Sequence, residues 1–498
     1  MADSNDVMDR LSGHRTAWFR FSGTFELLGN VFIFSLPDVV RPDPGSAPLL
    51  FLQICRLWRD VALRTPQLWK SIHFETTRGV LHPITDGSPD FSLTQKLEQF
   101  SMWLGRAGVL PLDIHLNLYG TSDILSPFVS VISKESYRLK ALELSCHQPA
   151  IDIINQGLVS GAPLLENFTM EVRWEGHFSV GEKVLDLSCA PNLQSAQVLV
   201  HYTHQPVPTL IIPNTLKRVV LRDCLLRSDD KENRTIIDGL LYLHMRLTPP
   251  SQSFQILRLT PNVQELHVSM ISNDHLISSE SIASQEHIRL SHLTTLIIHA
   301  IDIPRRGTRR GNLCIQNLMS ILTLPTLQTL VIQPNGEIHL ASLLRRSKSH
   351  LTSLTLERVR FTDDSFIELL RELVFIEKLN VQCTGGEVRD RSLSFLTVRG
   401  RETSSGMLVA CPYLKQLSIT DGRTLSYSHP GVEFSPQAII AFIQSRNGKE
   451  VDSGGNPLAC KLVSCSLMMK GNSRQVLDIR THLKSKILDE DLDLNLLY

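Results

Sequence analysis

The sequence predicts an α/β fold in which a short helical segment at the N-terminus precedes an irregular solenoid, an arc of strands backed by helices. Three observations between residues 136 and 449 favour this fold class: an apolar triplet recurs, a proline often stands two residues before it, and helix-like stretches separate the triplets. A unit of strand, turn and helix cannot bury its own apolar face, so such units must stack on their neighbours.

The first predicted element is a helix from Phe25 to Leu36. Its apolar side chains at positions i, i+1, i+4 and i+5 form one stripe, because residues one turn apart lie on the same helix face. The members of this stripe are Leu27, Leu28, Val31 and Phe32. Pro37 ends the helix, and a loop rich in proline, glycine and serine follows at residues 42–46.

A second helix is predicted from Pro48 to Leu63, with Thr65-Pro66 as its stop, and Leu68–Phe74 then alternates like a strand. One stripe of this helix contains Leu50, Ile54, Leu57, Trp58 and Val61, and further apolar residues lie partly off it, namely Leu49, Phe51, Leu52 and Leu63. A helix that is apolar all round must be buried all round. Either the downstream domain covers this surface, or it is a docking face for a partner helix.

The run from Phe51 to Ile72 resembles the second half of F-box domains from mushroom-forming, basidiomycete-type fungi, which read approximately VCRxWRxIAxxTPxLWxxI. The first predicted helix resembles the first F-box helix, but Gly23-Thr24 stands where the family usually has Leu-Pro. The same fungal proteins carry a WLxRAGxLPLxIxL segment, which is similar to the predicted amphipathic helix Leu93–Ala107 and the alternating strand Leu112–Leu118.

This resemblance implies that the N-terminal helices dock on the Skp-type adaptor of a cullin–RING ubiquitin ligase. The candidate adaptor-binding residues are Leu27, Leu28, Val31, Phe32, Leu36, Pro37, Leu50, Ile54, Leu57 and Trp58. Leucine and aromatic anchors on short helices are typical of such contacts. Some of these residues must instead form the core of the helical domain, and the sequence does not divide the two sets.

The recurring unit is an apolar residue, two others, an apolar residue, one other and an apolar residue. Its first positions are Leu139, Leu165, Leu193, Leu216, Val263, Leu293, Leu327, Leu351, Ile376 and Leu414, with a median spacing of 28 residues. That spacing lies within the range of leucine-rich repeats, roughly 20–29 residues, so we expect degenerate repeats of this kind. The long gap between Leu216 and Val263 is expected to hide a further unit or an insertion, and Phe254–Leu259 is its candidate strand. Helices are predicted at Asp364–Leu373 and Pro436–Gln444.

Five parts follow from these patterns. They are an N-terminal tail (1–22), an F-box-like helical domain (23–76), connecting strand–helix units (77–135), a leucine-rich-repeat-like solenoid (136–449) and a C-terminal cap or tail (450–498). A last strand is expected within Lys461–Met469, and the acidic segment Leu488–Tyr498 is either a cap or disordered.

Composition and motifs predict a protein without its own chemistry. The 50 basic and 50 acidic residues balance, so no whole-chain field favours nucleic acid or an anionic membrane. No apolar run reaches the roughly 20 residues of a spanning helix, and nine scattered cysteines suggest reduced thiols in the cytoplasm or nucleus. No phosphate loop, nucleophile motif or zinc-ligand array is present, so no cofactor or metal is expected. Cys460 and Cys465 are expected to be structural thiols, and His201 and His204 to lie on a surface strand or loop.

The sequence therefore favours the substrate-recognition subunit of a Skp–cullin–F-box ligase, whose repeats bind a substrate protein that the sequence does not name. The alternative is a leucine-rich-repeat scaffold that joins no ligase because Gly23-Thr24 has cost it adaptor affinity. A third class, a hydrolase or transferase on an α/β fold, lacks any nucleophile or metal constellation in the sequence. The basic run Arg305–Arg310 is either a solvated insertion or a substrate contact or nuclear-import signal.

Overall fold

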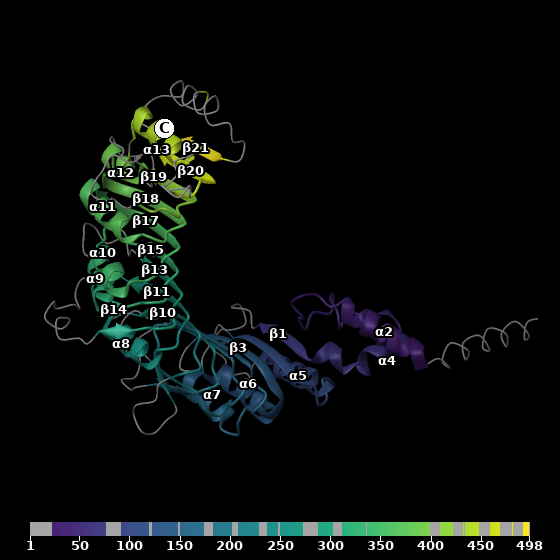
Figure 1. The fold of residues 1–498 in the computed structure, drawn as a ribbon. Coiled ribbons are helices and arrows are strands. Elements are labelled where there is room, and N and C mark those ends of the chain that lie inside the picture. The colour runs from purple at the N-terminus through teal and green to yellow at the C-terminus, as the bar shows by residue number, and fades with distance from the viewer. Residues whose placement is uncertain are drawn as a thin grey trace, which may run out of the picture. The chain divides into compact units, whose positions relative to one another are not determined.

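The computed structural model contains all 498 residues and describes most of them. The described residues are 22–75, 91–118, 122–147, 150–173, 183–201, 208–228, 237–247, 250–271, 287–301, 311–334, 336–398, 409–421, 432, 434–447, 459–468, 481 and 492–497. The chain divides into two compact units, residues 1–216 and 217–498. Both units mix helices with strands that pair in parallel (Figure 1).

Unit 1 begins with short helices. They are α2 (Ser22–Phe34), α3 (Phe51–Ile54), α4 (Arg56–Leu63) and the 3-10 helix η2 (Pro66–Trp69), followed by strand β1 (Ser71–Glu75). The prediction of one continuous helix from Pro48 to Leu63 is wrong, because Cys55 is extended (φ −159°, ψ 170°) and separates α3 from α4. Residues seven apart in a continuous helix are about 10.5 Å apart along its axis. The break brings the ring centroids of Phe51 and Trp58 to 5.8 Å, so both rings pack against α2.

The rest of unit 1 is a parallel sheet with helices. Its elements are α5 (Phe91–Arg106), β2 (Leu112–Leu118), α6 (Ser122–Lys134), β3 (Leu139–His147), α7 (Ala150–Leu158), β4 (Asn167–Arg173), β5 (Val184–Asp186), β6 (Ser195–His201) and β7 (Thr209–Ile212). The strand order is β1-β2-β3-β4-β6, and β5 pairs separately with β7. The predicted strand Leu112–Leu118 is confirmed, whereas the predicted strand Leu68–Phe74 begins only at Ser71 because Pro66–Trp69 forms η2.

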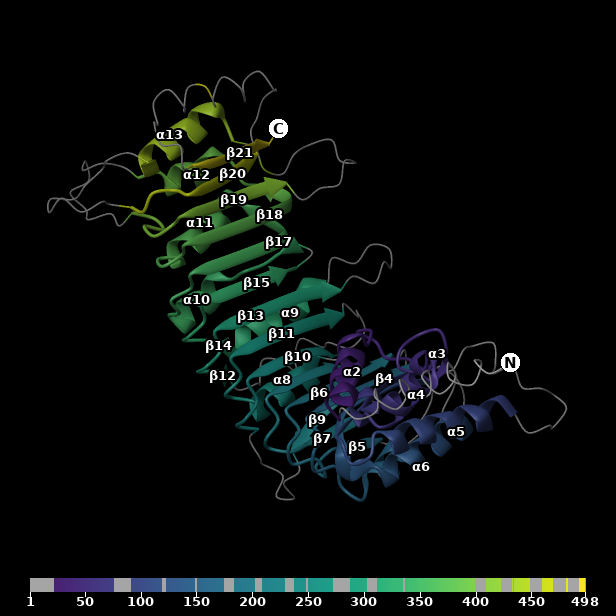
Figure 2. The same cartoon turned by 90° about the vertical axis from the view of Figure 1, so that its right-hand side faces the viewer.

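Unit 2 continues the same pattern. Its elements are β8 (Arg218–Arg222), β9 (Leu225–Ser228), β10 (Tyr242–Leu247), α8 (Pro250–Leu259), β11 (Glu265–Ile271), β12 (Ile288–Arg289), β13 (Thr295–Ile301), α9 (Gly311–Ile321), β14 (Leu322–Thr323), β15 (Thr329–Gln333), β16 (Gly336–Glu337), α10 (Ala341–Ser347), β17 (Ser353–Thr362), α11 (Asp363–Glu372), β18 (Lys378–Glu387), α12 (Asp390–Leu396), β19 (Gln416–Asp421), α13 (Pro436–Asn447), β20 (Ser464–Met468) and β21 (Asp493–Leu497). The main sheet has the order β8-β10-β11-β13-β15-β17-β18-β19-β20-β21. Figure 2 shows these strands following one another in chain order, and Figure 1 shows the helices along one side of them.

Each of the ten predicted repeat units contains a strand of these sheets, and the first apolar position of every unit is at most 3% exposed. The candidate strand Phe254–Leu259 is wrong, since these residues belong to helix α8. The missing unit starts instead at Leu240, and its strand is β10. Leu240, Leu243 and Met245 fit the apolar triplet, at 24 residues from Leu216 and 23 from Val263. All three are fully buried.

Alternation in the strands gives each sheet a buried face and an open face. Strand β6, for example, alternates half-exposed and buried residues along its whole length. The residues on the buried face pack under the helices, since successive side chains of a strand point to opposite sides. The other face carries half-exposed side chains, polar ones and also apolar ones such as Leu199 and Ile297.

Three arginines connect neighbouring strand–helix segments through hydrogen bonds to backbone carbonyls. Arg446 on α13 donates to the carbonyl oxygens of Leu396 (2.7 and 3.0 Å), Cys411 (2.9 Å) and Ala410 (2.5 Å), and it is 2% exposed. Arg346 donates to the carbonyls of Leu322 and Met319, and Arg138 to those of Leu104 and Leu110. The carbonyls of Leu396, Met319 and Leu104 belong to the last turns of α12, α9 and α5, where helices leave acceptors without intrahelical partners. No motif in the sequence predicts these contacts.

The C-terminal predictions are resolved in part. The expected last strand is β20, and the described part of the acidic segment forms β21, which pairs with β20. The basic run Arg305–Arg310 lies outside the described residues. None of the helices in the described ranges combines the length and the apolar character that a membrane crossing requires.

Candidate protein-docking surface

The helices at the start of unit 1 are held together by three aromatic rings. Phe32 on α2 stacks on Phe51 of α3 with ring centroids 4.1 Å apart, and Trp58 on α4 lies 4.9 Å from Phe32. Phe32 and Phe51 are 1% and 6% exposed, and Trp58 is half-buried. Aromatic pairs at such distances add to the free energy gained from burying their surface. These three residues therefore form the core of the helical segment.

A second cluster fastens this segment to the sheet of unit 1. The Trp69 indole is fully buried, donates its Nε1 hydrogen to the carbonyl of Ala62 at 2.9 Å and packs edge-on against Trp103 of α5. Trp103 donates in turn to the carbonyl of Ser71 at 3.2 Å, at the start of β1. The guanidinium of Arg106 lies 4.6 Å from the Trp69 ring centroid. The tryptophan of the TPxLW pattern thus serves the internal packing of unit 1.

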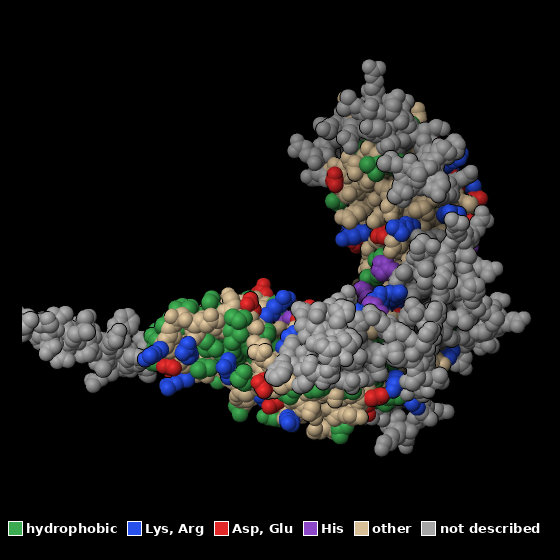
Figure 3. Space-filling view, turned by 180° about the vertical axis from the view of Figure 1, so that it is seen from behind, with side chains coloured by type: hydrophobic (Ala, Val, Ile, Leu, Met, Phe, Trp, Pro, Cys, Tyr) green, Lys and Arg blue, Asp and Glu red, His purple; other side chains and the backbone are tan. Residues whose placement is uncertain are grey.

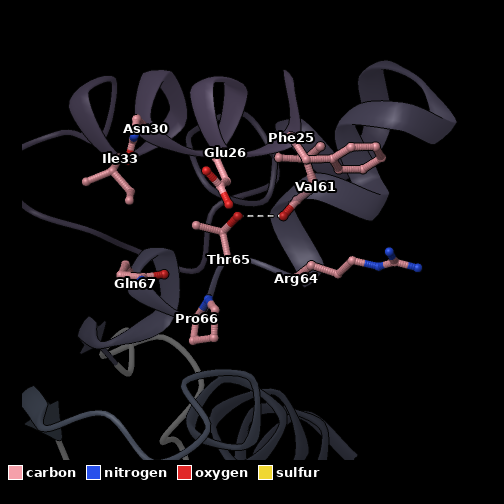
Figure 4. Close-up of a pocket in the computed structure, with 10 residues that line it drawn as sticks. Phe25, Glu26, Asn30, Ile33, Val61, Arg64, Thr65, Pro66 and Gln67 are labelled. Atoms are coloured by element: carbon pink, nitrogen blue, oxygen red, sulfur yellow. Dashed lines mark hydrogen bonds between the residues drawn. The ribbon is translucent and has the colours of Figure 1, made fainter. Parts of the chain in front are cut away.

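Helix α2 approaches the end of α4 closely at Gly29. A Cβ atom at this position would lie 3.1 Å from Oγ1 of Thr65, a distance tighter than ordinary van der Waals contact. The Thr65 hydroxyl donates to the carbonyl of Val61 at 2.7 Å and so caps the last turn of α4 (Figure 4). A glycine and a threonine together set the distance between the two helices.

The opposite side of α2 carries an uncovered apolar stripe. Leu27, Val31 and Phe34, at positions i, i+4 and i+7, are 67%, 59% and 90% exposed. We call these three residues the outer stripe. Residues at this spacing lie on one helix face, so the outer stripe is a continuous surface.

Helices α3 and α4 add further exposed apolar side chains. Leu50, Ile54 and Leu63 are 38%, 50% and 42% exposed. Figure 3 shows hydrophobic side chains gathered on this N-terminal part of unit 1. Large apolar groups that remain uncovered in a folded chain mark surfaces suited to another protein.

The ten candidate adaptor-binding residues therefore fall into three groups. Leu27, Val31, Leu50 and Ile54 are exposed, and Pro37 is exposed at the end of α2. Leu28, Leu36, Leu57 and Trp58 are half-buried, and Phe32 is buried. Phe34 is the most exposed apolar side chain of α2, yet it is not among the ten candidate residues predicted from the sequence. A longer heptad reading of α2, in which residues 27, 31 and 34 share a face, would have found it.

Helix α4 carries most of the charge beside this surface. Arg56 and Arg59 are exposed on α4, and Arg64 follows its last residue, against one acidic residue, Asp60. Arg59 donates from Nε to the carbonyl of Leu52 at 2.8 Å, which bridges the break between α3 and α4.

No known protein-family model matches this chain, and no curated protein matches it. The assignment of the surface therefore depends on its residues and their geometry.

A groove lies on the other side of α2. It has a volume of about 650 Å³ and is lined by residues of α2, α4 and η2, namely Phe25, Glu26, Gly29, Asn30, Ile33, Val61, Arg64, Thr65, Pro66 and Gln67. Figure 4 shows Glu26, Thr65 and Gln67 around it. The one hydroxyl in this lining, that of Thr65, is engaged with Val61, and the lining contains neither histidine nor cysteine. The groove thus offers polar and apolar contacts but no nucleophile paired with a base.

The other residues considered for chemistry belong to other elements of the chain. In the described ranges, no three His, Cys, Asp or Glu side chains are arranged to hold a metal ion. Cys465 is buried and Cys460 half-buried, and burial raises the pKa of the Cys465 thiol to about 12. His201, on β6, lies with Nε2 3.0 Å from Oε1 of Glu171, whereas His204 lies outside the described residues.

Proposed function

We propose that this chain is a non-catalytic substrate receptor of a Skp–cullin–F-box ubiquitin ligase. In this proposal, α2, α3 and α4 form an F-box-like domain that docks on a Skp-type adaptor, and the sheets that follow form irregular leucine-rich repeats that bind a substrate protein. The receptor holds a substrate lysine near the charged conjugating enzyme, and this positioning raises the effective concentration of the lysine.

The uncovered outer stripe is the observation that carries the proposal. Three large apolar side chains at helical spacing are more than half exposed, while the aromatic core beneath them is complete. Because the chain leaves this surface open, a partner helix gains free energy by covering it. The proposed partner is a Skp-type adaptor because the run Phe51–Ile72 resembles F-box domains.

The proposed repeats draw support from the regularity of the strands. Parallel strands follow one another in chain order, and they recur where the apolar triplets do. Neighbouring strand–helix segments share a buried apolar layer, and the arginine contact of Arg446 is buried between two of them. Such stacking is typical of solenoid proteins, which present an extended open face to their partners.

Co-purification with a Skp-type adaptor tests the docking. We expect the wild-type chain to recover the adaptor, and a variant with Leu27→Ser, Val31→Ser and Phe34→Ser to lose it. Val109→Ser with Val159→Ser is the matched control, because these valines are 86% and 79% exposed elsewhere in unit 1. Failure of the wild-type chain to bind the adaptor would remove the proposed function, as would equal binding by the stripe variant.

A scaffold that joins no ligase is the second candidate. Gly23-Thr24 favours it, because these residues replace the Leu-Pro with which the family usually begins its first helix. Adaptor binding that is absent from the wild type but gained with Gly23→Leu and Thr24→Pro would support this candidate.

A further inference from the structure

The open face of the sheet in unit 2 carries a cluster of positive and aromatic side chains at its first four strands. Its members are Arg218 and Arg222 on β8, Tyr242, His244 and Arg246 on β10, His267 on β11 and His299 on β13. We call these seven residues the basic sheet face. All alternate with buried residues along their strands, so they lie on one side of the sheet.

The strand register places these side chains in adjacent rows. Arg222 pairs with Arg246 and Arg246 with Ser269, which pairs in turn with His299. In the next row, His244 pairs with His267, and their ring centroids are 5.5 Å apart. Figure 3 shows histidine and basic side chains close together on the sheet. Neighbouring rows of like-charged groups produce a positive potential over this surface.

Among the residues that the structure describes, few acidic groups offset this charge. Glu265 lies with Oε1 2.8 Å from Nε2 of His267, and Asp223 is 8% exposed. Arg246 has a buried Nε that forms no hydrogen bond. Burial, followed by the charge of Arg222, lowers the pKa of Arg246, while Asp223 acts in the opposite direction. The charge of Arg246 is therefore placed where an added anion would stabilise it.

The chemistry of this surface favours a peptide carboxylate over nucleic acid. Arg218 already covers the ring of Tyr242 at 3.7 Å, and His267 lies 5.2 Å from that ring, so stacking of a base on Tyr242 is obstructed. The later strands β15 to β20 carry mostly uncharged side chains such as Thr355, Asn380 and Ser418 on the same face, with Lys378 on β18 as an exposed positive charge. These strands offer hydrogen bonds but few charges for a long phosphate backbone.

We propose that the basic sheet face binds an acidic, extended peptide segment of the substrate protein. Neighbouring strands are spaced about 4.8 Å apart, so four strands span about 15 Å, which an extended peptide covers with about five residues. Arginine donors bind carboxylates through charge-assisted hydrogen bonds. The proposal rests on the proposed function in calling the ligand a substrate, but the binding itself needs no adaptor.

The pH dependence follows from the histidines. His244 has a lowered pKa, first because of burial and then because of His267, His299 and Arg218. Glu265, Arg222, Arg246 and Tyr242 complete the groups that face these rings. An acidic ligand favours the protonated form of His244, so its binding strengthens as the pH falls toward the lowered pKa of this group.

Fluorescence anisotropy with the full chain tests this inference. The probe is a labelled peptide of about ten residues with a central run of Asp and Glu, compared with the same peptide carrying Asn and Gln. We expect the acidic peptide to bind at least about tenfold more tightly, and Arg218→Gln with Arg246→Gln to remove that difference. Arg218→Lys with Arg246→Lys should retain part of it, and the acidic peptide should bind more tightly near pH 6 than near pH 8.

The matched control is Lys378→Gln, which removes an exposed positive charge from β18 on the same face. Equal binding of the two peptides would overturn the proposal, and so would an equal loss in the control. Tighter binding of a single-stranded RNA of similar length, displacing the peptide, would also overturn it. The variant with Leu27→Ser, Val31→Ser and Phe34→Ser should bind the peptide as the wild type does. The peptide-binding test and the adaptor-binding test can therefore fail independently of each other.

Discussion

Phe32 and Phe34 are two positions apart on α2, yet they are 1% and 90% exposed. The same substitution at these two positions therefore separates the stability of the helical segment from docking. Phe34→Ala should leave stability within about 0.5 kcal/mol, because an exposed side chain loses few contacts. Phe32→Ala should cost about 3–5 kcal/mol, since it removes a ring stacked at 4.1 Å on Phe51 and leaves a cavity.

The effect of Phe34→Ala on adaptor binding follows from its exposed surface. A phenylalanine buries about 150–250 Å² when it is fully covered, and apolar surface is worth about 25 cal/mol per Å². If the partner covers about half of the ring, the loss is about 2 kcal/mol, or roughly 30-fold in the dissociation constant. We therefore expect Phe34 to contribute to adaptor binding without being needed for folding.

Tryptophan fluorescence suits the stability measurement. All five tryptophans lie within residues 1–216, so their emission in a urea titration follows unit 1. Trp58 belongs to the cluster that Phe32→Ala disrupts, and its emission should shift at a lower urea concentration in that variant. Surface plasmon resonance with the adaptor measures the binding. The reasoning is refuted if Phe34→Ala unfolds as early as Phe32→Ala, or if it binds the adaptor as the wild type does.

Two further predictions concern the body of the chain. Arg446→Met should destabilise unit 2 by about 3 kcal/mol, because the carbonyls of Leu396, Cys411 and Ala410 lose their donor in a buried site. Far-UV circular dichroism in a urea titration measures the loss of stability. A loss as small as that of the exposed control Arg371→Met would contradict the prediction. Burial raises the pKa of four thiols to about 12, namely Cys146, Cys383, Cys411 and Cys465. The unfolded chain releases these protons from about pH 9 upward while the folded chain retains them, so stability should fall as the pH rises from 9 toward 12, by about 1.4 kcal/mol per thiol for each pH unit. Urea unfolding near pH 8 and pH 10 checks this, and the decrease should become smaller when Cys465 is replaced by Ala; an unchanged decrease would argue against the linkage.

The repeat strands could be predicted because they depend on local patterning. The apolar triplet, which a proline precedes in five of the ten units, coincides with a strand in every unit from Leu139 to Leu414. The unit at Leu240 has the same triplet, but its third position is Met245 and it stands beside an apolar stretch of comparable strength at Phe254. Periodicity alone does not distinguish a short buried strand from a short buried helix, which is why Phe254–Leu259 was assigned to the wrong class.

Breaks and buried polar contacts could not be predicted in this way. No proline or glycine beside Cys55 signals its extended backbone. This backbone conformation lets Phe51 and Trp58 pack together against Phe32 of α2. Arg446 likewise looks like any basic residue at the end of a helix. Only its neighbours, the last turn of α12 and residues 410 and 411, turn it into a buried donor.

Local patterning predicts short N-terminal helices and a succession of strands, because both depend on the spacing of apolar residues along a few turns or strands. The structure in turn shows which apolar residues of α2 form the core and which remain open, since burial is set by side chains that approach from other elements. The exposure of Leu27, Val31 and Phe34 and the positive face of β8 to β13 are properties of that packing.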